Sequence, residues 1–356
     1  MHVAPKDCCL AATVKDHQLS LRDNPLRDNP LGEKRTASLD LRATAFADTF
    51  DRLLNHLEQT IRGKREVLRM ALVALFAEGH LLIEDVPGTG KTTLGKALAR
   101  SIDGTWNRIQ FTPDLLPSDV TGTTIYNQGN GELEFHPGPV FANVVLGDEI
   151  NRASPKTQSA LLEVMEEHQV TVDAHPYLVP RPFIVLATQN SVEFGGTYPL
   201  PEAQVDRFLM RISLGYLDVE SEIDVLMRDR HRTVVDLVDA PILAVGDIAS
   251  MVDFAADVHT EQVVVAFVVQ IARATRSMPE LRLGASTRGS IALLRASRAL
   301  AASEGRTYVV PDDVVRLAVP VLAHRLILTS DAEIRGIRTE SLIERILSSV
   351  SPPVRR

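Results

Sequence analysis

Apolar side chains recur every three or four residues between Ala45 and Ile61, and this spacing predicts an amphipathic helix. Residues Glu66–Glu78 repeat the pattern in a more apolar form, so we expect a second, largely buried helix there. Gly79 is typical of the residue that ends a helix, because glycine readily takes the left-handed conformation required there. Two helices are therefore expected before the first strand.

Short unbroken apolar runs further along the chain predict strands that are buried on both faces. They occur at 80–84, 144–146 and 183–187. Helical patterns separate them, one through Leu94–Ile102 and one at Pro155–His168, where Ser154 is suited to cap the helix. Strands that alternate with helices indicate an α/β fold with a mainly parallel sheet.

From about Asp218 onward the chain shows helical periodicity and no strand pattern, which predicts an all-α second domain. The first forty residues differ from both regions, because they carry a direct Leu-Arg-Asp-Asn-Pro repeat at 21–25 and 26–30 and few large apolar side chains. The expected parts are a disordered tail at 1–40, an α/β core at 41–215 and a helical domain at 216–356.

The chain has 356 residues and a formal net charge of −8, from 38 Lys and Arg against 46 Asp and Glu. This acidic balance counts against nucleic acid as a partner, because nucleic-acid-binding proteins more often carry a basic excess. The two cysteines are neighbours, Cys8 and Cys9, which excludes a disulfide scaffold and a cysteine-bound zinc site. No apolar run approaches the roughly 20 residues that cross a bilayer, and we expect a cytoplasmic protein without a signal peptide.

A glycine-rich turn lies between the first predicted strand and its helix. Its sequence is Asp85-Val86-Pro87-Gly88-Thr89-Gly90-Lys91-Thr92-Thr93. Glycines allow the backbone to curl so that successive N–H groups point at phosphate oxygens, and the following helix adds its positive dipole end. Lys91 can reach the β- and γ-phosphates of a nucleotide, and Thr92 can bind Mg²⁺. Asp85 replaces the first glycine of the general pattern, but the strand before the turn and the helix after it support phosphate binding.

Two acidic residues, Asp148 and Glu149, follow the second apolar run. Parallel strands end at the same edge of a sheet, so both carboxylates should lie beside the phosphate-binding turn. Asp148 would then hold the water shell of Mg²⁺, and Glu149 would polarise the attacking water. Asn190 follows the third predicted strand, from which it could hydrogen-bond the γ-phosphate or the water.

Longer segments of the chain together resemble the MoxR family of AAA+ ATPases. These segments are Ile83–Thr92, Gly147–Glu167, Gly196–Phe208 and Gly284–Gly289. The resemblance extends over roughly residues 45–350 and leaves only the tail outside it. It implies an AAA+ P-loop αβα domain with a mainly parallel sheet, followed by an all-α lid domain.

The same resemblance implies roles for individual residues. Lys91 and Thr92 match the Walker A motif, whereas Asp148 and Glu149 match the Walker B pair. Asn190 matches sensor 1. The residues expected to contact the nucleotide are Ile61, Gly63, Pro87, Gly88, Thr89, Gly90, Lys91, Thr92 and Thr93, with Thr92 and Asp148 at the metal.

Two arginines complete the expected catalytic set. Arg207 matches an arginine finger that acts in trans on a neighbouring subunit, and such a finger contributes about 10³–10⁵ in rate. Arg288 matches sensor 2 and could close over the phosphate from the start of a lid helix. Lys64 stands where the family often has a Gln near the adenine, which leaves the contacts to the base open.

Two inserted hairpins are expected, at 123–135 and 169–180. In this branch of AAA+ proteins such hairpins line the central pore or its face, while ordinary surface hairpins are the alternative. The resemblance implies an ATP- and Mg²⁺-dependent homo-hexamer that remodels a protein partner, typically one with a von Willebrand factor A domain. Two other functions remain open: a motor that acts on nucleic acid, and a nucleotide-dependent scaffold without turnover.

Overall fold

The computed structural model describes residues 30–86, 88–129, 131–189, 198–228 and 241–353, and side chains from Ser38 onward. The chain divides into two units, Met1–Ser38 and Leu39–Arg356. The sheet and all helices after α1 belong to the second unit. Among the described residues, no helix is both long and apolar enough to cross a membrane.

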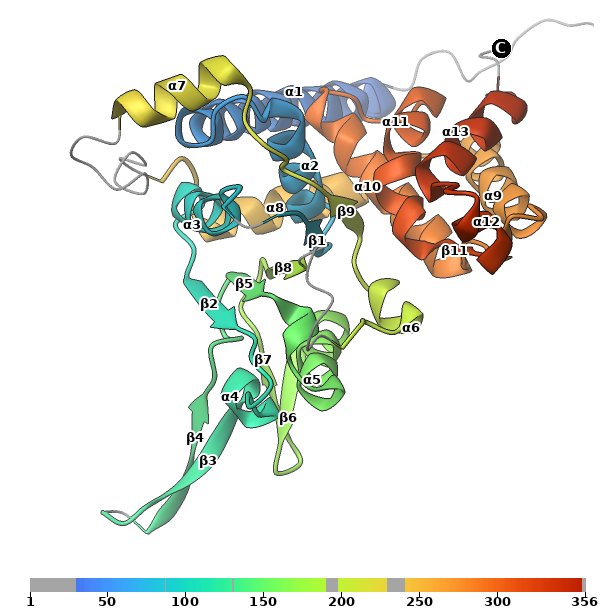
Figure 1. The fold of residues 1–356 in the computed structure, drawn as a ribbon. Helices are drawn as coiled ribbons and strands as arrows, with labels where there is room; N and C mark the ends of the chain where they lie inside the picture. The colour runs from blue at the N-terminus through green and yellow to red at the C-terminus, as the bar shows by residue number, and fades with distance from the viewer. Residues whose placement is uncertain (1–29, 87, 130, 190–197, 229–240, 354–356) are drawn as a thin grey trace, which may run out of the picture. The chain divides into compact units, whose positions relative to one another are not determined.

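Helices α1 (Pro30–Thr60) and α2 (Arg65–Phe76) precede the sheet (Figure 1). The backbone is helical from Pro30, within the segment that the sequence predicts to be a disordered tail, and residues 1–29 lie outside the described part. Leu39 and Leu41 are exposed, and α1 is buried in the core from Ala43 onward. The sequence before Ser38 contains Leu, Glu, Lys and Arg, which are good helix formers.

A five-stranded parallel sheet lies at the centre of the second unit, with strand order β2-β5-β8-β1-β9 (Figure 1). Its strands are β1 (Leu81–Glu84), β2 (Trp106–Gln110), β5 (Val144–Asp148), β8 (Ile184–Gln189) and β9 (Met210–Ile212). The parallel α/β fold and the three central strands are therefore confirmed. The two edge strands were not predicted, because only Ile109 is buried in β2 and β9 has just three residues.

The two faces of the sheet bury alternate residues of each strand, because successive side chains of a strand point to opposite faces. Leu81 and Ile83 belong to the hydrophobic cluster that contains α2 and α3 (Lys91–Ser101). Leu82 belongs to a second cluster on the other face, with α5 (Pro155–Glu167). Ser154 caps α5 by accepting a hydrogen bond from the Thr157 amide, as the sequence predicts.

The lid at the end of the chain is helical, as expected, with a small strand pair that the sequence did not reveal. Strand β10 (Leu281–Leu283) pairs antiparallel with β11 (Ile327–Leu328), so the lid is not strictly all-α. Strands of three and two residues are too short to leave a period-two pattern. The lid helices are α8 (Val245–Ala256), α9 (Gln262–Arg276), α10 (Thr287–Ser303), α11 (Pro311–Leu322), α12 (Ser330–Ile334) and α13 (Thr339–Ser349).

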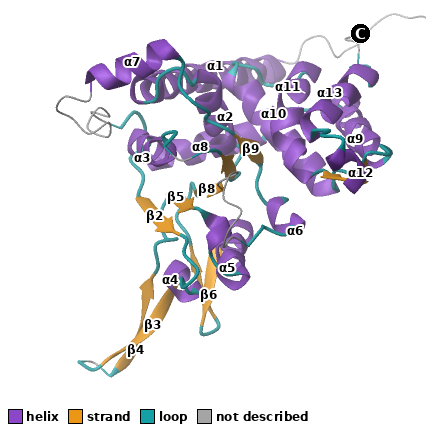
Figure 2. Cartoon of the chain, viewed as in Figure 1, coloured by secondary structure: helices purple, strands orange, loops and turns teal. Residues whose placement is uncertain are grey.

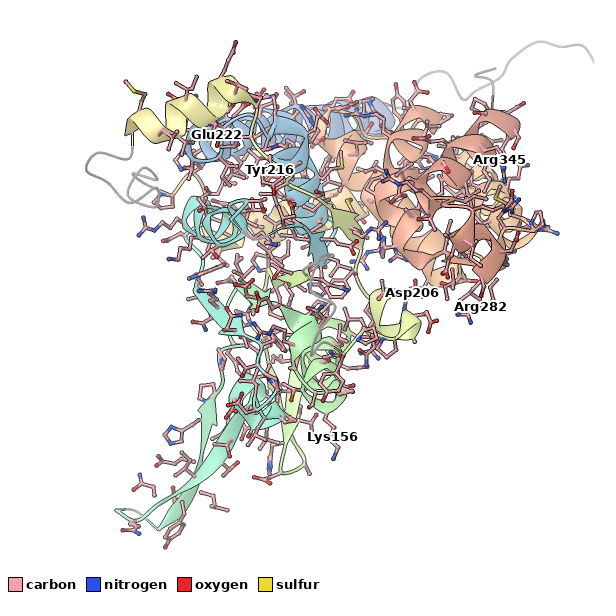
Figure 3. All side chains as sticks on the ribbon, viewed as in Figure 1. Lys156, Asp206, Tyr216, Glu222, Arg282 and Arg345 are labelled. Carbon is pink, nitrogen blue, oxygen red and sulfur yellow. The ribbon has the colours of Figure 1, made fainter. Side chains whose placement is uncertain are left out.

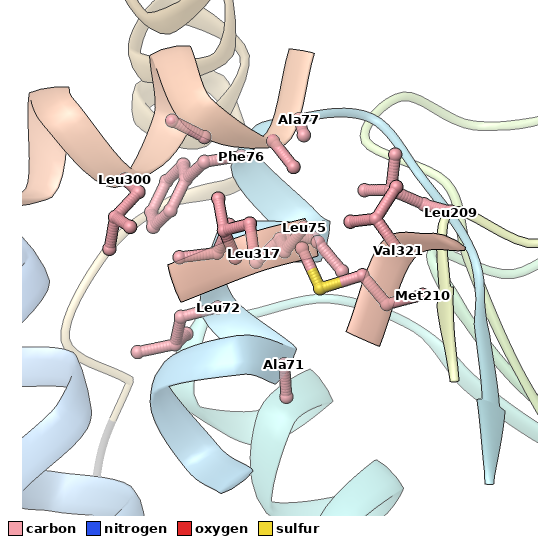
Figure 4. Packing of buried hydrophobic residues seen from close by; sticks show 14 of the residues in the cluster. Ala71, Leu72, Leu75, Phe76, Ala77, Leu209, Met210, Leu300, Leu317 and Val321 are labelled. Atoms are coloured by element: carbon pink, nitrogen blue, oxygen red, sulfur yellow. The ribbon is translucent and has the colours of Figure 1, made fainter. Parts of the chain in front are cut away.

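The α/β core and the lid share one hydrophobic cluster. Leu72 and Phe76 of α2 lie against Leu300 of α10 and Leu317 of α11 in this cluster (Figure 4). Met210 of the edge strand β9 belongs to it as well. The lid is therefore packed on the core by apolar burial, which favours association in proportion to the area removed from water.

Both predicted hairpins are present and project from the sheet (Figure 2). They are formed by β3 (Gly122–Asn127) with β4 (Glu132–Pro137) and by β6 (Gln169–Val172) with β7 (His175–Leu178). The rings of Phe135 and Tyr177 stack with centroids 4.0 Å apart, and Thr124 Oγ1 donates to Asp173 Oδ2 at 2.7 Å. The hairpins are thus attached to each other as well as to the sheet.

Asp85 ties the end of β1 to the chain that leaves β9. Its Oδ2 accepts hydrogen bonds from the amides of Leu214 and Gly215, at 2.7 and 2.8 Å. Its Oδ1 accepts from the Val86 amide at 3.0 Å. The carboxylate is buried, so these donors have no water to replace it.

His80, just before β1, joins α5 to β8. Its Nε2 lies 3.0 Å from the Met165 carbonyl oxygen, and its Nδ1 accepts from the Val185 amide at 3.1 Å. These two contacts require the neutral ring with the proton on Nε2. Burial lowers the pKa of His80 to about 4, because the charged form would lose its hydration.

Asp85→Ala is expected to lower the free energy of unfolding by about 3 kcal/mol, because the buried amide of Leu214 and the half-buried amides of Val86 and Gly215 lose their acceptor. Urea denaturation of the purified full chain measures the loss. Asp85→Asn, which keeps one acceptor oxygen, should cost about half as much. An alanine variant as stable as the wild type would contradict this role.

The pKa of His80 predicts a loss of stability in acid. The unfolded chain takes up the proton near pH 6.5 and the folded chain only near pH 4. The free energy of unfolding should therefore fall as the pH is lowered between these values, by up to about 3 kcal/mol. His80→Gln should show a flatter pH dependence in the same denaturation series, and an unchanged slope would argue against His80 as the cause.

Candidate nucleotide-binding site

The turn between β1 and α3 has the backbone that a phosphate-binding loop needs. Gly88 and Gly90 have φ angles of +84° and +92°. A Cβ at either position would meet no atom within 4 Å, so conformation, and not crowding, calls for glycine here. Gly90 caps α3, and Pro87 lies outside the described residues.

Lys91 begins α3 and is nearly buried, with 8% of its surface exposed. Its Nζ donates to the carbonyl oxygen of Asp85 at 3.0 Å. Burial lowers the pKa of Lys91, although the carboxylates of Asp85, Asp148 and Glu149 act to raise it. The structure therefore brings Lys91 together with Asp148 and Glu149 at one edge of the sheet.

Asp148 ends β5 beside this loop. Its Oδ1 accepts from Thr188 Oγ1 at 2.6 Å, and its Oδ2 accepts from Arg108 Nη2 at 2.5 Å. Thr188 and Arg108 belong to the strands on either side of β5. Both carboxylate oxygens are thus oriented by neighbouring strands.

Glu149 stands in the left-handed region, with φ +56°, which is uncommon for a residue other than glycine. Its amide donates to Thr188 Oγ1 at 2.8 Å, which supports this conformation. Its Oε2 accepts from Gln110 Nε2 at 3.1 Å and from Arg152 Nη1 at 2.9 Å. Strained backbone held by surrounding contacts is typical of functional positions.

Sequence reasoning missed four of these partners: Arg108, Gln110, Arg152 and Thr188. Arg108 and Gln110 lie on β2, whose pairing with β5 could not be inferred without recognising that strand. Thr188 stands two residues before Asn190, at the end of a strand that was predicted. Asn190 itself lies outside the described residues.

The oxygen ligands available at this edge of the sheet suit Mg²⁺ better than a metal ion that takes all of its ligands from the protein. Within the described part of the chain, no three His, Cys, Asp or Glu residues gather as a metal site. Mg²⁺ typically takes one or two carboxylates with phosphate oxygens and keeps several waters. Asp148 and the hydroxyl of Thr92, in the first turn of α3, are the residues that would hold it.

A cavity of about 240 Å³ lies next to the loop. Ile61, Gly88–Gly90, Thr93 and Gly215–Leu217 line it, so the expected loop residues and Ile61 meet in one place. Gly63 lines a neighbouring hollow instead. Lys64 donates to the carbonyl oxygen of Tyr216, which lies with Glu222 on this side of the molecule (Figure 3). Lys64 is therefore tied to the wall of this cavity.

Arg207 and Arg288 lie away from the loop of their own chain. Both line a cavity of about 350 Å³ with Gly79 and His80, which precede β1, whereas the loop follows the other end of that strand. Both guanidinium groups pair with Glu166. Arg288 thus lies away from the loop of its own chain in this structure, and its expected role at the phosphate stays a prediction.

The chain is similar to AAA ATPases at the level of family models. The model described as the ATPase family associated with various cellular activities matches residues 80–210, and the AAA lid domain model matches residues 273–346. The first match covers the parallel sheet up to the start of β9, and the second runs from the end of α9 into α13.

Individual relatives extend the similarity over most of the chain. YeaC of Bacillus subtilis is 48% identical, covering 85% of this chain and 94% of that protein. Chaperone MoxR1 of Mycobacterium tuberculosis is 42% identical, and the match covers 87% of this chain and 84% of that protein. A candidate ATPase of Cytophaga hutchinsonii with a solved structure superposes with a TM-score of 0.83 at 39% identity, covering 90% and 99%. The chain therefore belongs to the MoxR family of AAA+ ATPases.

Proposed function

We propose that the chain is a Mg²⁺-dependent ATPase that converts ATP and water to ADP and phosphate and uses the energy to remodel a protein partner. The observation that carries this proposal is the meeting of Lys91, Asp148 and Glu149 beside the glycine loop and its cavity. Relatives named as chaperones support the same function.

In this proposal the loop amides and Lys91 bind the β- and γ-phosphates. Thr92 would bind Mg²⁺ and Asp148 would hold its water shell, and the ion would supply positive charge to the phosphate oxygens. Glu149 orients the attacking water, and Gln110 and Arg152 hold its carboxylate in position. Asn190, which matches sensor 1 in sequence, acts on the γ-phosphate or the water.

Arg207 acts in trans, and a ring of subunits, which we expect to be a homo-hexamer, supplies it to each site. Its position at the amino end of β1, away from its own loop, supports this arrangement. A guanidinium group that enters a neighbouring site stabilises the charge of the transition state. Arg288, on the same side, belongs to the same shared site.

A protein is the proposed partner, and a von Willebrand factor A domain protein in the cytoplasm is the proposed type. The hairpins carry exposed apolar side chains, Ile125, Tyr126 and Leu133 on one and Leu178 on the other. Exposed apolar groups of this kind suit contact with a protein chain. The net charge of −8 argues against a nucleic-acid motor, which salt-dependent stimulation of hydrolysis by DNA would reveal.

Lys91→Ala and Glu149→Gln should each lower the steady-state ATPase rate by at least about 10²-fold, because each removes a charged group that acts on the reacting phosphate or water. A coupled assay of phosphate release on the full chain measures this. If the wild type and Lys91→Ala hydrolysed ATP at the same rate, the result would instead favour a nucleotide-dependent scaffold without turnover.

Mixing two inactive variants tests the role of Arg207. Arg207→Ala subunits keep their own site, and Glu149→Gln subunits keep the finger, so mixed rings should recover part of the activity. Arg207→Ala alone should be slower than wild type by about 10³-fold. As a control, mixing Arg207→Ala with the double variant Arg207→Ala/Glu149→Gln should recover nothing. Equal rates in the two mixtures would rule out action in trans.

A further inference from the structure

Glu166, near the end of α5, joins the two arginines that the shared site requires. Its Oε2 lies 3.1 Å from Nη2 of Arg207, and its Oε1 accepts from Nη2 of Arg288. Arg207 is also fixed by donating to the Leu162 carbonyl oxygen at 2.7 Å. One carboxylate thus occupies the space between two guanidinium groups, one from the core and one from the lid.

The surrounding cavity has more cationic than anionic groups. Arg295 and Arg325 also line it, and Arg325 is nearly buried and pairs with Asp206 between α6 (Glu202–Val205) and the lid (Figure 3). Arg295 donates to the carbonyl oxygens of Ala77 and Glu78. The acidic residues that line the cavity are Glu78, Glu166 and Asp206. The carboxylate of Glu78 forms an ion pair with Arg181.

Glu166 can leave its two partners at low cost. Its side chain is 36% exposed, and those of Arg207 and Arg288 are 30% and 47% exposed. Ion pairs with this much contact with water contribute little to stability. A phosphate group carries more charge and more acceptor oxygens than a carboxylate, so it is the stronger partner for two guanidinium groups.

We propose that Glu166 competes with the phosphate group of a neighbouring subunit's nucleotide for the guanidinium groups of Arg207 and Arg288. In a free subunit, Glu166 pairs with Arg207 and Arg288 and holds both side chains. When a nucleotide-loaded neighbour docks, its phosphate takes both guanidinium groups and Glu166 is released to water. Glu166 thereby sets how readily subunits assemble, and this inference rests on the proposed shared site.

The first test measures ATP-dependent assembly in the Glu149→Gln background, where bound ATP persists. Glu166→Gln removes the competing carboxylate. The subunit concentration at which half of the protein is assembled, measured by sedimentation velocity, should therefore fall by about fivefold. Glu167→Gln makes the same charge change at the next, exposed residue and should leave that concentration unchanged. An unchanged or higher concentration for Glu166→Gln, or an equal shift for Glu167→Gln, would overturn the proposal.

A second test does not depend on hydrolysis or on the ring. In Lys91→Ala subunits, whose own loop is impaired, pyrophosphate binding is measured by calorimetry with and without Glu166→Gln. The added substitution should tighten binding by about fivefold, and a further Arg288→Ala should reverse the gain. No tightening would reject competition at Glu166. A failure of ATP turnover in the wild type, with tightening retained, would reject only the proposed function.

Glu166→Asp guards against a folding artefact. Its shorter side chain keeps the charge but reaches two guanidinium groups less easily, so it should fall between wild type and Glu166→Gln in both tests. Thermal unfolding of each variant establishes that it is folded at the assay temperature. A folded Glu166→Asp subunit that exceeds Glu166→Gln in either test would contradict the competition.

Discussion

The buried contacts of Asp85 hold together the loop, the cavity wall and the lysine of the candidate nucleotide site. Its carboxylate accepts from the amides that follow β9, while its carbonyl oxygen accepts from Lys91. One residue therefore fixes the end of β1, the wall of the cavity and the lysine head group. The general phosphate-loop pattern has glycine at this position, so the side chain that departs from the pattern is the one that anchors this loop.

The parts of the fold that the sequence revealed are those in which burial follows a simple period. β1, β5 and β8 are buried on both faces, so their apolar runs were recognisable, and the meeting of Lys91 with Asp148 followed from their parallel order. β2 lies at an edge and mixes exposed and buried positions. Without it, the pairing of Arg108 with Asp148 could not be foreseen.

Contacts between distant segments were beyond the reach of local patterns. Glu166, Arg207 and Arg288 are brought together by three different elements, and each alone resembles an ordinary surface charge. The family motif indicated two of them but said nothing of the carboxylate between them. Only the fold shows that these arginines share one partner at the amino end of the sheet.

The hydrophobic cluster shared by α2 and the lid has a mechanical consequence. Opening the lid as a flap would expose Phe76, Leu300 and Leu317 to water, at about 25 cal/mol for each Å² of apolar surface. In the proposed ring, movement of one whole subunit past another would expose none of these side chains. Each chain is therefore stiff between its core and its lid, and in such a ring the movement belongs at the boundary between neighbouring subunits.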